Sequence, residues 1–360
     1  ASRAVDSASD REQLHLSAVK AWFESDLALA SRLYQEIQLN HPTDLMALFA
    51  GHWLDFYLGD AKALMSRVDC ALGDWGNSTP GYGYVLAMYA FGLEENGQYD
   101  QAEKLGRRSV ELNPADAWGV HSVTHVMEMT GRAEEGIEWL QSTLPGWGSS
   151  TMKLHNWWHA LLLYIDLGDT DTALDLYDTR LVDDDRVDAE ALADRVSALA
   201  RLSLLGVDVG DRWLLLAKLW EPMMFDARSP FNDLHALLTF HYSNLGDLAQ
   251  ALVECLRSEY DRTIPMMRVG ASVIEGVDAL FQGDNDAALA SLQEHFSEVN
   301  LIGGSHAQRD LVSQITLEAA VRAGEWASAR AMLKERKLRR ESMPYAYSRH
   351  CEQRMAVGST

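Results

Sequence analysis

Small residues recur at fixed distances along a chain whose other apolar residues follow helical spacing. The repeated pattern is Gly-x-x-x-x-Ala or Gly, and amphipathic stretches such as LALASRLYQEI (27–37) fill the intervals between its copies. The clear copies are GQYDQAEKLG from Gly97, GRAEEGIEWL from Gly131, GDTDTALDLY from Gly168, GDLAQALVEC from Gly246, GDNDAALASL from Gly283 and GEWASARAML from Gly324. Looser copies start at Gly59 and Gly206, and an N-terminal copy has Ser25 in the glycine position and Ala30 five residues later. Because no convincing alternating strand pattern interrupts these copies, the sequence predicts helices throughout.

The spacing of the copies predicts helical hairpins. Glycine accepts the left-handed conformation that ends a first helix, and the small residue lets the second helix approach closely. Successive glycines from Gly59 to Gly324 are 34 to 41 residues apart, close to the roughly 34-residue period of tetratricopeptide repeats. Repeats would then begin near residues 11, 45, 83, 117, 154, 192, 232, 269 and 310. We therefore predict an all-α, tetratricopeptide-repeat-like superhelix, a solenoid of about nine antiparallel helix pairs forming a single domain over residues 1–360.

Several long strings also resemble one family within this class. They are REQLHLSAV (11–19), HPTDLMAL (41–48), DAWGVHSVTHVMEMTGR (116–132), LHNWWHALLLYIDLGD (154–169), FNDLH (231–235) and GGSHAQRD (303–310). With these strings the chain resembles the tetratricopeptide repeat protein 38 family over nearly its whole length. The resemblance implies the helix-pair architecture and no particular reaction.

Charge and composition exclude several classes of partner. Asp and Glu (53) outnumber Lys and Arg (31), so the formal charge is −22 and a nucleic acid backbone would be repelled. The short basic run KERKLRR (334–340) is typical of a solvated helix face. No apolar stretch approaches 18 residues, and ASRAVDSASD at the N-terminus does not resemble a signal peptide. We predict a cytoplasmic protein with no nucleic acid or membrane partner.

Neither the cysteines nor a search for familiar catalytic motifs indicates a particular reaction. Cys70, Cys255 and Cys351 lie far apart without CxxC spacing, which argues against a disulfide framework or a structural zinc site. The sequence has no Walker loop, no dinucleotide-binding glycine fingerprint and no GxSxG elbow. Whether the protein is an enzyme is left open by these patterns.

Two histidine pairs on neighbouring repeats are the sharpest chemical feature. In this fold, positions 2, 5, 9 and 12 of each first helix are expected to face the concave groove. His121, His125 and Glu128 occupy three of these positions, and His155 and His159 lie near the start of the next first helix. Since neighbouring first helices pack side by side, we predict that the four imidazoles converge in one groove.

Three interpretations of the histidine pairs stay open at this point. Two HxxxH pairs can hold zinc or a similar ion, with Glu128 or another carboxylate completing the shell. The HEXXH arrangement of metalloproteases is absent from both pairs. The histidines can instead form a metal-free polar pocket with acid-base chemistry, or simply bridge helices in the core. We predict the metal-free pocket and no cofactor.

Other polar residues stand in apolar surroundings. His52, Trp53 and Asp55 lie in AGHWLDFYLGD (50–60), where a buried carboxylate would need a histidine, tyrosine or backbone partner. A structural hydrogen bond between helices is the alternative for His52 and Asp55. Asp233 and His235 stand at the start of another helix, where Asp233 or its neighbour Asn232 can equally serve as the N-cap.

The string GGSHAQRD predicts an unusual helix start. Gly303 and Gly304 permit a sharp entry, Ser305 is a candidate N-cap, and His306 follows on the first turn. Arg309 could bind a ligand carboxylate or form a structural fork with a groove carboxylate such as Asp233.

Aromatic residues favour a ligand pocket. Trp53, Trp118 and Trp158 lie near the histidine-bearing repeats, although tryptophans also serve in interhelical packing. We predict that a small molecule or a short peptide binds in a pocket lined by histidine, tryptophan and acidic residues, with acid-base or hydrolytic chemistry as an extension. The alternatives are a protein-interaction scaffold without catalysis and a metal-dependent enzyme that uses the paired HxxxH motifs. A partner protein is therefore compatible with the sequence.

Overall fold

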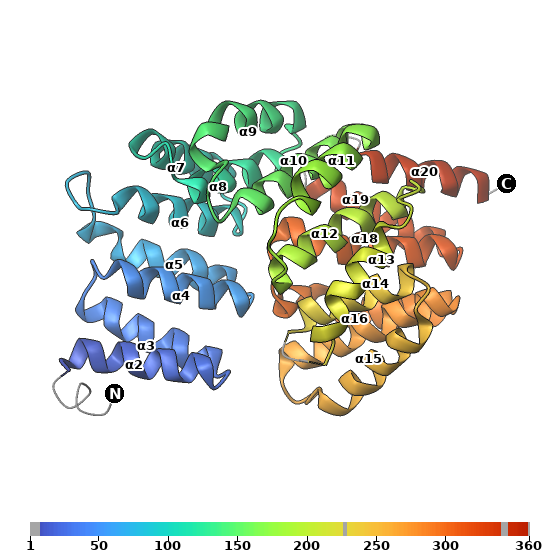
Figure 1. Ribbon diagram of the computed structural model, residues 1–360, viewed down its shortest axis with the longest axis horizontal. Coiled ribbons are helices and arrows are strands. Elements are labelled where there is room, and N and C mark those ends of the chain that lie inside the picture. The colour runs from blue at the N-terminus through green and yellow to red at the C-terminus, as the bar shows by residue number, and fades with distance from the viewer. Residues whose placement is uncertain (1–7, 226–228, 340–344, 359–360) are drawn as a thin grey trace. The chain divides into compact units, whose positions relative to one another are not determined.

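The computed structural model describes residues 8–225, 229–339 and 345–358, and within these ranges it contains helices and no strand. The chain divides into two compact units. The first comprises residues 1–126 and 143–150, and the second comprises residues 127–142 and 151–360. Helices α8 and α9 continue from one unit into the other (Figure 1).

Helices pair in chain order. The first part of the chain contains α2 (Asp10–Phe23), α3 (Leu27–Asn40), α4 (Leu45–Tyr57), α5 (Ala61–Ala71), α6 (Tyr82–Glu94), α7 (Tyr99–Leu112), α8 (Ala117–Met129) and α9 (Ala133–Trp147). The rest contains α10 (Lys153–Leu167), α11 (Thr170–Leu176), α12 (Ala189–Leu204), α13 (Arg212–Trp220), α14 (Pro230–Tyr242), α15 (Gly246–Glu259), α16 (Pro265–Gln282), α17 (Asn285–Glu294), α18 (His306–Arg322), α19 (Trp326–Arg339) and α20 (Ala346–Gly358). Four short helical segments follow α5, α11, α13 and α17. They are, in this order, η1 (Leu72–Asp74), η2 (Tyr177–Val182), η3 (Glu221–Met223) and η4 (Phe296–Ile302).

The predicted fold class is confirmed. First helices of the pairs begin at residues 10, 45, 82, 117, 153, 189, 230, 265 and 306, within four residues of every repeat start that the sequence predicts. The small residues five positions after the turns are buried, including Ala102, Ala173, Ala288 and Ala329. Close contact between the two helices of a hairpin therefore depends on these positions. Helix α20 is an addition that the repeat pattern does not predict, and the single 1–360 domain stays a prediction.

One turn of the structure differs from the turn that the sequence pattern predicts. Gly97, Gly131, Gly168, Gly283 and Gly324 all have positive φ, as does Ser25 in the N-terminal copy. Gly246 does not; it is the first residue of α15, and Asn244 has the positive φ (56°). Asparagine tolerates the left-handed conformation, so it replaces glycine at this turn. The buried small residue is accordingly Ala249, five positions after Asn244.

Packing in the first unit brings backbones close together. A Cβ atom on Gly92 of α6 would lie 2.7 Å from the Cα atom of Met65 in α5. A larger residue would push these helices apart, which is why glycine stands within this helix.

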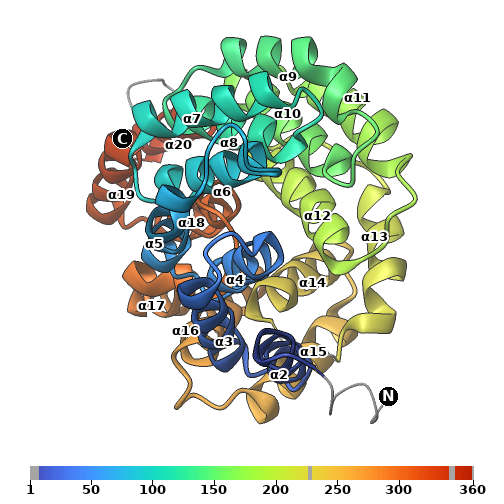
Figure 2. The same cartoon turned by 90° about the vertical axis from the view of Figure 1, so that its left-hand side faces the viewer.

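The second unit folds back on itself. First helices α10, α12, α14 and α16 pack in succession, and Figure 2 shows α12 beside α14. Helix α18 also contacts α12: the Nη2 atom of Arg201 donates a hydrogen bond of 2.7 Å to the carbonyl oxygen of Ala307. Helix α20 packs against both α18 and α10. Helices from both ends of this unit are therefore in contact.

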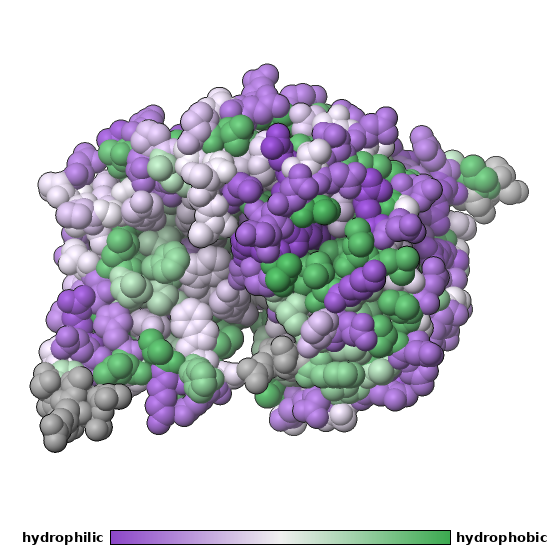
Figure 3. Space-filling model, viewed as in Figure 1, coloured by the Kyte–Doolittle hydropathy of each residue, from purple (hydrophilic) through white to green (hydrophobic). Residues whose placement is uncertain are grey.

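The outer face of the second unit is partly apolar. Leu214, Leu215 and Leu219 of α13 are exposed, and the space-filling view shows apolar surface in this part of the molecule (Figure 3). Across the described ranges, no helix combines the length and apolar character needed to traverse a bilayer.

Candidate functional site

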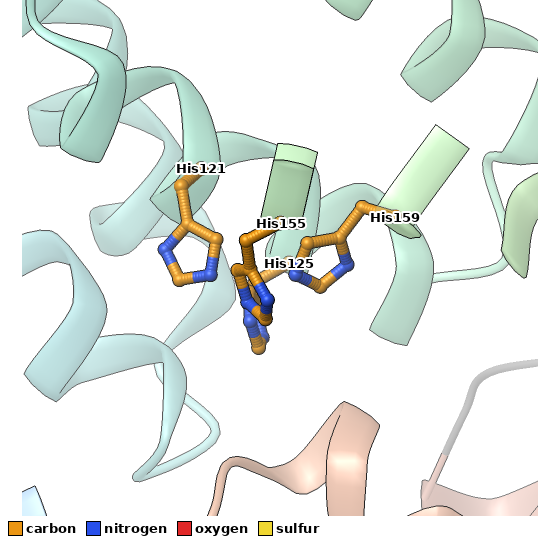
Figure 4. A group of neighbouring side chains, drawn as sticks. All are labelled: His121, His125, His155 and His159. Atoms are coloured by element: carbon orange, nitrogen blue, oxygen red, sulfur yellow. The ribbon is translucent and has the colours of Figure 1, made fainter. Parts of the chain in front are cut away.

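The two histidine pairs come from α8 and α10 (Figure 4). The rings of His121 and His125 lie 4.5 Å apart between centroids, and those of His155 and His159 lie 4.8 Å apart. The first pair belongs to the first unit and the second pair to the second unit. The convergence of all four rings in one groove, with or without a metal ion, therefore stays a prediction.

His52 links two first helices of the first unit. Its Nε2 atom lies 3.0 Å from the carbonyl oxygen of Met88, so Nε2 carries the hydrogen and donates it from α4 to α6. Burial lowers the pKa of His52 to about 3, and the charge of Arg67 contributes further. A neutral imidazole with this bond serves helix packing, which was the structural alternative for this residue.

Asp55 belongs to a buried ion pair. Both of its carboxylate oxygens accept from Arg67 of α5, over 2.6 Å and 2.9 Å. The hydroxyl of Ser31 in α3 donates to the same carboxylate over 2.7 Å, and Arg67 also donates to Gln38. The partner is thus a guanidinium and a serine, not the histidine, tyrosine or backbone donor expected from the sequence. The network ties α3, α4 and α5 together and gives Asp55 a structural role.

Aromatic rings line the first unit beside its histidines. Trp53 lies 5.4 Å from Trp118, which lies 4.7 Å from His121, as measured between ring centroids. The Nδ1 atom of fully buried His125 is 3.4 Å from a carboxylate oxygen of Glu94. Ligand atoms of Glu94, Glu95 and His125 lie within 4.8 Å of one another, so these residues are the candidate metal donors of the first unit.

Both histidines of the α10 pair face a carboxylate. The Nδ1 atom of His159 lies 3.0 Å from the Oε2 atom of Glu128, and both side chains are buried. The Nδ1 atom of His155 lies 2.8 Å from the Oδ2 atom of Asp194 on α12. Burial alone would lower the pKa of His155, but the charge and hydrogen bond of Asp194 outweigh it, and the pKa is raised above 6.5. Glu128 thus orients one imidazole, and Asp194 favours the protonated form of the other.

Trp158 lies directly beneath His155. The two rings are stacked with centroids 5.0 Å apart, and the guanidinium carbon of Arg201 lies 5.8 Å from the Trp158 ring. Trp158 is fully buried, yet its Nε1 hydrogen has no acceptor among the described residues. An indole N–H can only donate a hydrogen bond, so satisfying it requires an acceptor from elsewhere.

His235 has an acceptor nitrogen that lacks a donor, the reverse of Trp158. Its Nδ1 atom lies 2.7 Å from the carbonyl oxygen of Phe231, so Nδ1 carries the hydrogen. Burial lowers the pKa of His235 to about 4, and the positive charge of Arg201 contributes. The neutral ring therefore has an accepting Nε2 atom, which is buried and has no donor among the described residues. We call His155, Trp158, Asp194, Arg201 and His235 the inner polar site.

Asp233 has a structural partner, and it does not cap its helix. Asp233 accepts a hydrogen bond of 2.6 Å from the hydroxyl of Tyr260. The N-cap of α14 is Ser229, whose side chain accepts from the backbone of Asn232, and Pro230 begins the helix. The expectation that Asn232 or Asp233 caps this helix is therefore wrong, because Ser-Pro sets the helix start three residues earlier.

The start of α18 agrees with the sequence prediction. Gly303 and Gly304 have positive φ, and Ser305 is the N-cap in a capping box with Gln308. His306 is half-buried on the first turn. Arg309 donates a hydrogen bond to the carbonyl oxygen of Gly304, which fixes its side chain at the turn.

Sequence reasoning missed Asp194 and Arg201, the two charged residues of the inner polar site. They lie seven residues apart on α12, a helix that is buried along most of its length. Charged residues at this spacing share one helix face, which was a usable sign. Asn156 of α10 was also missed: it is fully buried, and neither amide atom of its side chain has a partner in the described part of the chain.

Comparisons with known proteins do not show the family of this chain. No family model matches the chain, so the resemblance to the tetratricopeptide repeat protein 38 family stays a prediction. A tetratricopeptide repeat protein from Parabacteroides merdae ATCC 43184 is similar with a TM-score of 0.43 and 16% identity, covering 77% of this chain and 99% of that chain. The P58(IPK) TPR domain is similar with a TM-score of 0.28 and 12% identity, covering 98% of each chain. The fold assignment therefore rests on the helix pairs themselves: the described residues form an all-α succession of helical hairpins.

Proposed function

We propose that the second unit binds a small organic molecule or a short peptide segment at the inner polar site. The observation that supports this proposal is that two buried polar groups near Arg201, one donor and one acceptor, lack hydrogen-bond partners among the described residues. Trp158 offers a buried N–H, and His235 offers a buried acceptor nitrogen, without partners among the described residues. Leaving either group unsatisfied costs about 1 to 3 kcal/mol, so a ligand that satisfies both would bind favourably.

The chemistry of these two groups defines the ligand. It must present an acceptor to Trp158 and a donor to His235, as a hydroxyl, a carboxamide or a peptide group does. A single unmet N–H would not be enough, since Trp220 on α13 also has a buried Nε1 atom without an acceptor in the described ranges. The inner polar site differs because one guanidinium relates to both groups: Arg201 lies 5.8 Å from the Trp158 ring, and its charge lowers the pKa of His235.

His155 gives the site a possible chemical step. Its imidazole is held by Asp194, whose charge and hydrogen bond raise the pKa of His155 and so favour the protonated form. Such a group can donate a proton to a bound hydroxyl or carbonyl oxygen. Acid-base chemistry is therefore the extension of the binding proposal, and it needs no cofactor.

The experiment compares two tryptophan variants. Trp158→Phe removes the N–H of the inner polar site, and Trp220→Phe makes the same change on α13. Small molecules and peptides released by denaturing each purified protein would be identified by mass spectrometry. We expect a stoichiometric compound from the wild type and from Trp220→Phe, and at least about tenfold less of it from Trp158→Phe.

Two outcomes would contradict the proposal. Equal retention by all three proteins would place the compound elsewhere. Absence of any compound from the wild type, with a partner protein retained equally by wild type and Trp158→Phe, would support the scaffold alternative.

A further inference from the structure

A groove lies between the last two helices of the second unit, away from the residues of the inner polar site. Leu333 and Leu338 of α19 and Met355 and Ala356 of α20 form its apolar floor, and its volume is about 630 Å³. Leu338 is 74% exposed. A large aliphatic side chain exposed in a groove is favourably covered by another apolar group.

The rim of this groove is basic. Arg330, Lys334 and Lys337 of α19 line it, with Glu352 of α20 as the acidic member. Lys337 and Glu352 form an ion pair over 2.5 Å, which leaves the charges of Arg330 and Lys334 in excess. The chain as a whole has the opposite balance, with a net charge of −22. The positive rim is thus a local feature that selects negative partners.

The two helices are held firmly enough to keep the groove open. Besides the ion pair, Arg336 of α19 donates to the hydroxyl of Ser348 in α20 over 3.0 Å. Helix α20 is anchored to α18, where the Tyr347 hydroxyl donates to the carbonyl oxygen of Gln314 over 2.9 Å. In Figure 1, α19 and α20 appear at the end of the second unit. A preformed two-helix groove of this kind accepts a third helix with little ordering of its own side chains.

We propose that this groove binds an amphipathic helix of a partner protein, with leucine-like residues on one face and Asp or Glu beside them. The lining residues on α19 follow i, i+3, i+4, i+7 and i+8 spacing from Arg330 to Leu338, so they form one stripe along the helix. A partner helix lying along this stripe places its apolar face on the floor and its carboxylates at the cationic rim. Lys334 and Lys337, which the sequence assigns to a solvated face, are then recognition residues.

The test uses two labelled peptides and the full chain. One peptide is an amphipathic helix about four turns long with leucines on one face and glutamates flanking them, and the other has lysine in place of each glutamate. Fluorescence anisotropy would measure their affinities. We expect the glutamate peptide to bind at least about tenfold more tightly, and Lys334→Glu to remove most of this preference.

Leu338→Asp and Leu215→Asp provide a matched pair of variants. Both leucines are exposed, at 74% and 56%, so neither substitution should unfold the protein. We expect Leu338→Asp to abolish peptide binding and Leu215→Asp, on α13, to leave it unchanged. The proposal would be overturned by equal affinity for both peptides, by no binding of the glutamate peptide, or by an insensitive Leu338→Asp variant. A wild-type dimer in sedimentation that Leu338→Asp dissociates would also overturn it, since the occupant would then be a second copy.

Discussion

Two regions of the chain, one in each unit, bury polar groups in different ways. In the first unit, Asp55 and Arg67 bond to each other twice, and Ser31 and Gln38 provide further contacts. In the second unit, Trp158 and His235 lie around Arg201 and keep polar atoms without partners among the described residues. Both regions looked alike in the sequence, as polar residues within apolar helices.

This difference distinguishes buried polar groups that stabilise the fold from buried polar groups that can bind a ligand. A buried ion pair whose members bond to each other contributes to helix packing, and removing one partner leaves an uncompensated charge. A buried donor without an acceptor already lowers stability, so its removal costs little and its presence requires another reason. Functional residues are therefore better sought among unmet polar atoms than among buried charges in general.

The largest predicted effect falls on the ion pair of the first unit. Arg67→Leu leaves Asp55 buried without its cation, and we expect the free energy of unfolding to fall by about 3 to 5 kcal/mol. Urea denaturation followed by circular dichroism measures this change. The double variant Asp55→Leu/Arg67→Leu should lose less than Arg67→Leu alone, because no charge is then stranded. A loss below about 1 kcal/mol for the single variant would show that the pair is not what holds α4 and α5 together.

The next effect is a pH dependence that involves His52. Its folded-state pKa is about 3, well below the value of about 6.5 expected for the unfolded chain. As the pH falls below 6.5, the unfolded state takes up a proton that the folded state does not, so stability declines until the pH nears 3. We expect His52→Gln to reduce the slope of unfolding free energy between pH 6 and 4 by up to about 1.4 kcal/mol per pH unit.

An exposed histidine provides the control for this slope. His41 lies on the surface, at the end of α3. Denaturation series at several pH values should show the wild-type slope in His41→Gln. An unchanged slope in His52→Gln would mean that His52 takes up a proton in the folded state.

The smallest predicted effect concerns the inner polar site. Trp158→Phe keeps most of the ring and removes an N–H that has no acceptor in the described ranges. We expect the free energy of unfolding of ligand-free protein to change by less than about 1 kcal/mol, in contrast with Arg67→Leu. Thermal or urea denaturation of ligand-stripped protein checks this. A loss as large as that of Arg67→Leu would assign Trp158 to the core and remove the contrast between the two regions.

Much of the fold could be predicted because it depends on short-range spacing. A turn residue with positive φ recurs from Ser25 to Gly324, and at most of these turns a small residue follows five positions later, so the spacing locates most hairpins. The exception at Asn244 arises because asparagine can adopt the same conformation as glycine. Helix starts such as Ser305 were predictable for the same reason, since the cap and its partner lie within four residues.

The partners in the candidate site could not be predicted in this way. Arg201 reaches Ala307, over a hundred positions away in the sequence, and Asp194 pairs with His155 on another helix. Such contacts depend on how repeats pack in three dimensions. The sequence suggested that the Asp55 carboxylate needed a partner when buried, but it did not identify Arg67 as that partner or Met88 as the partner of His52.

The most direct test of the central claim is the indole N–H resonance of Trp158. It would be recorded in as-purified protein and again after unfolding, dialysis and refolding have removed bound compounds. We predict that the Trp158 resonance lies downfield in the as-purified protein, where a ligand acceptor bonds it, and moves upfield after stripping. The Trp220 resonance should stay in place and serves as the internal control. An identical Trp158 resonance in both samples would contradict the claim that the inner polar site holds a ligand.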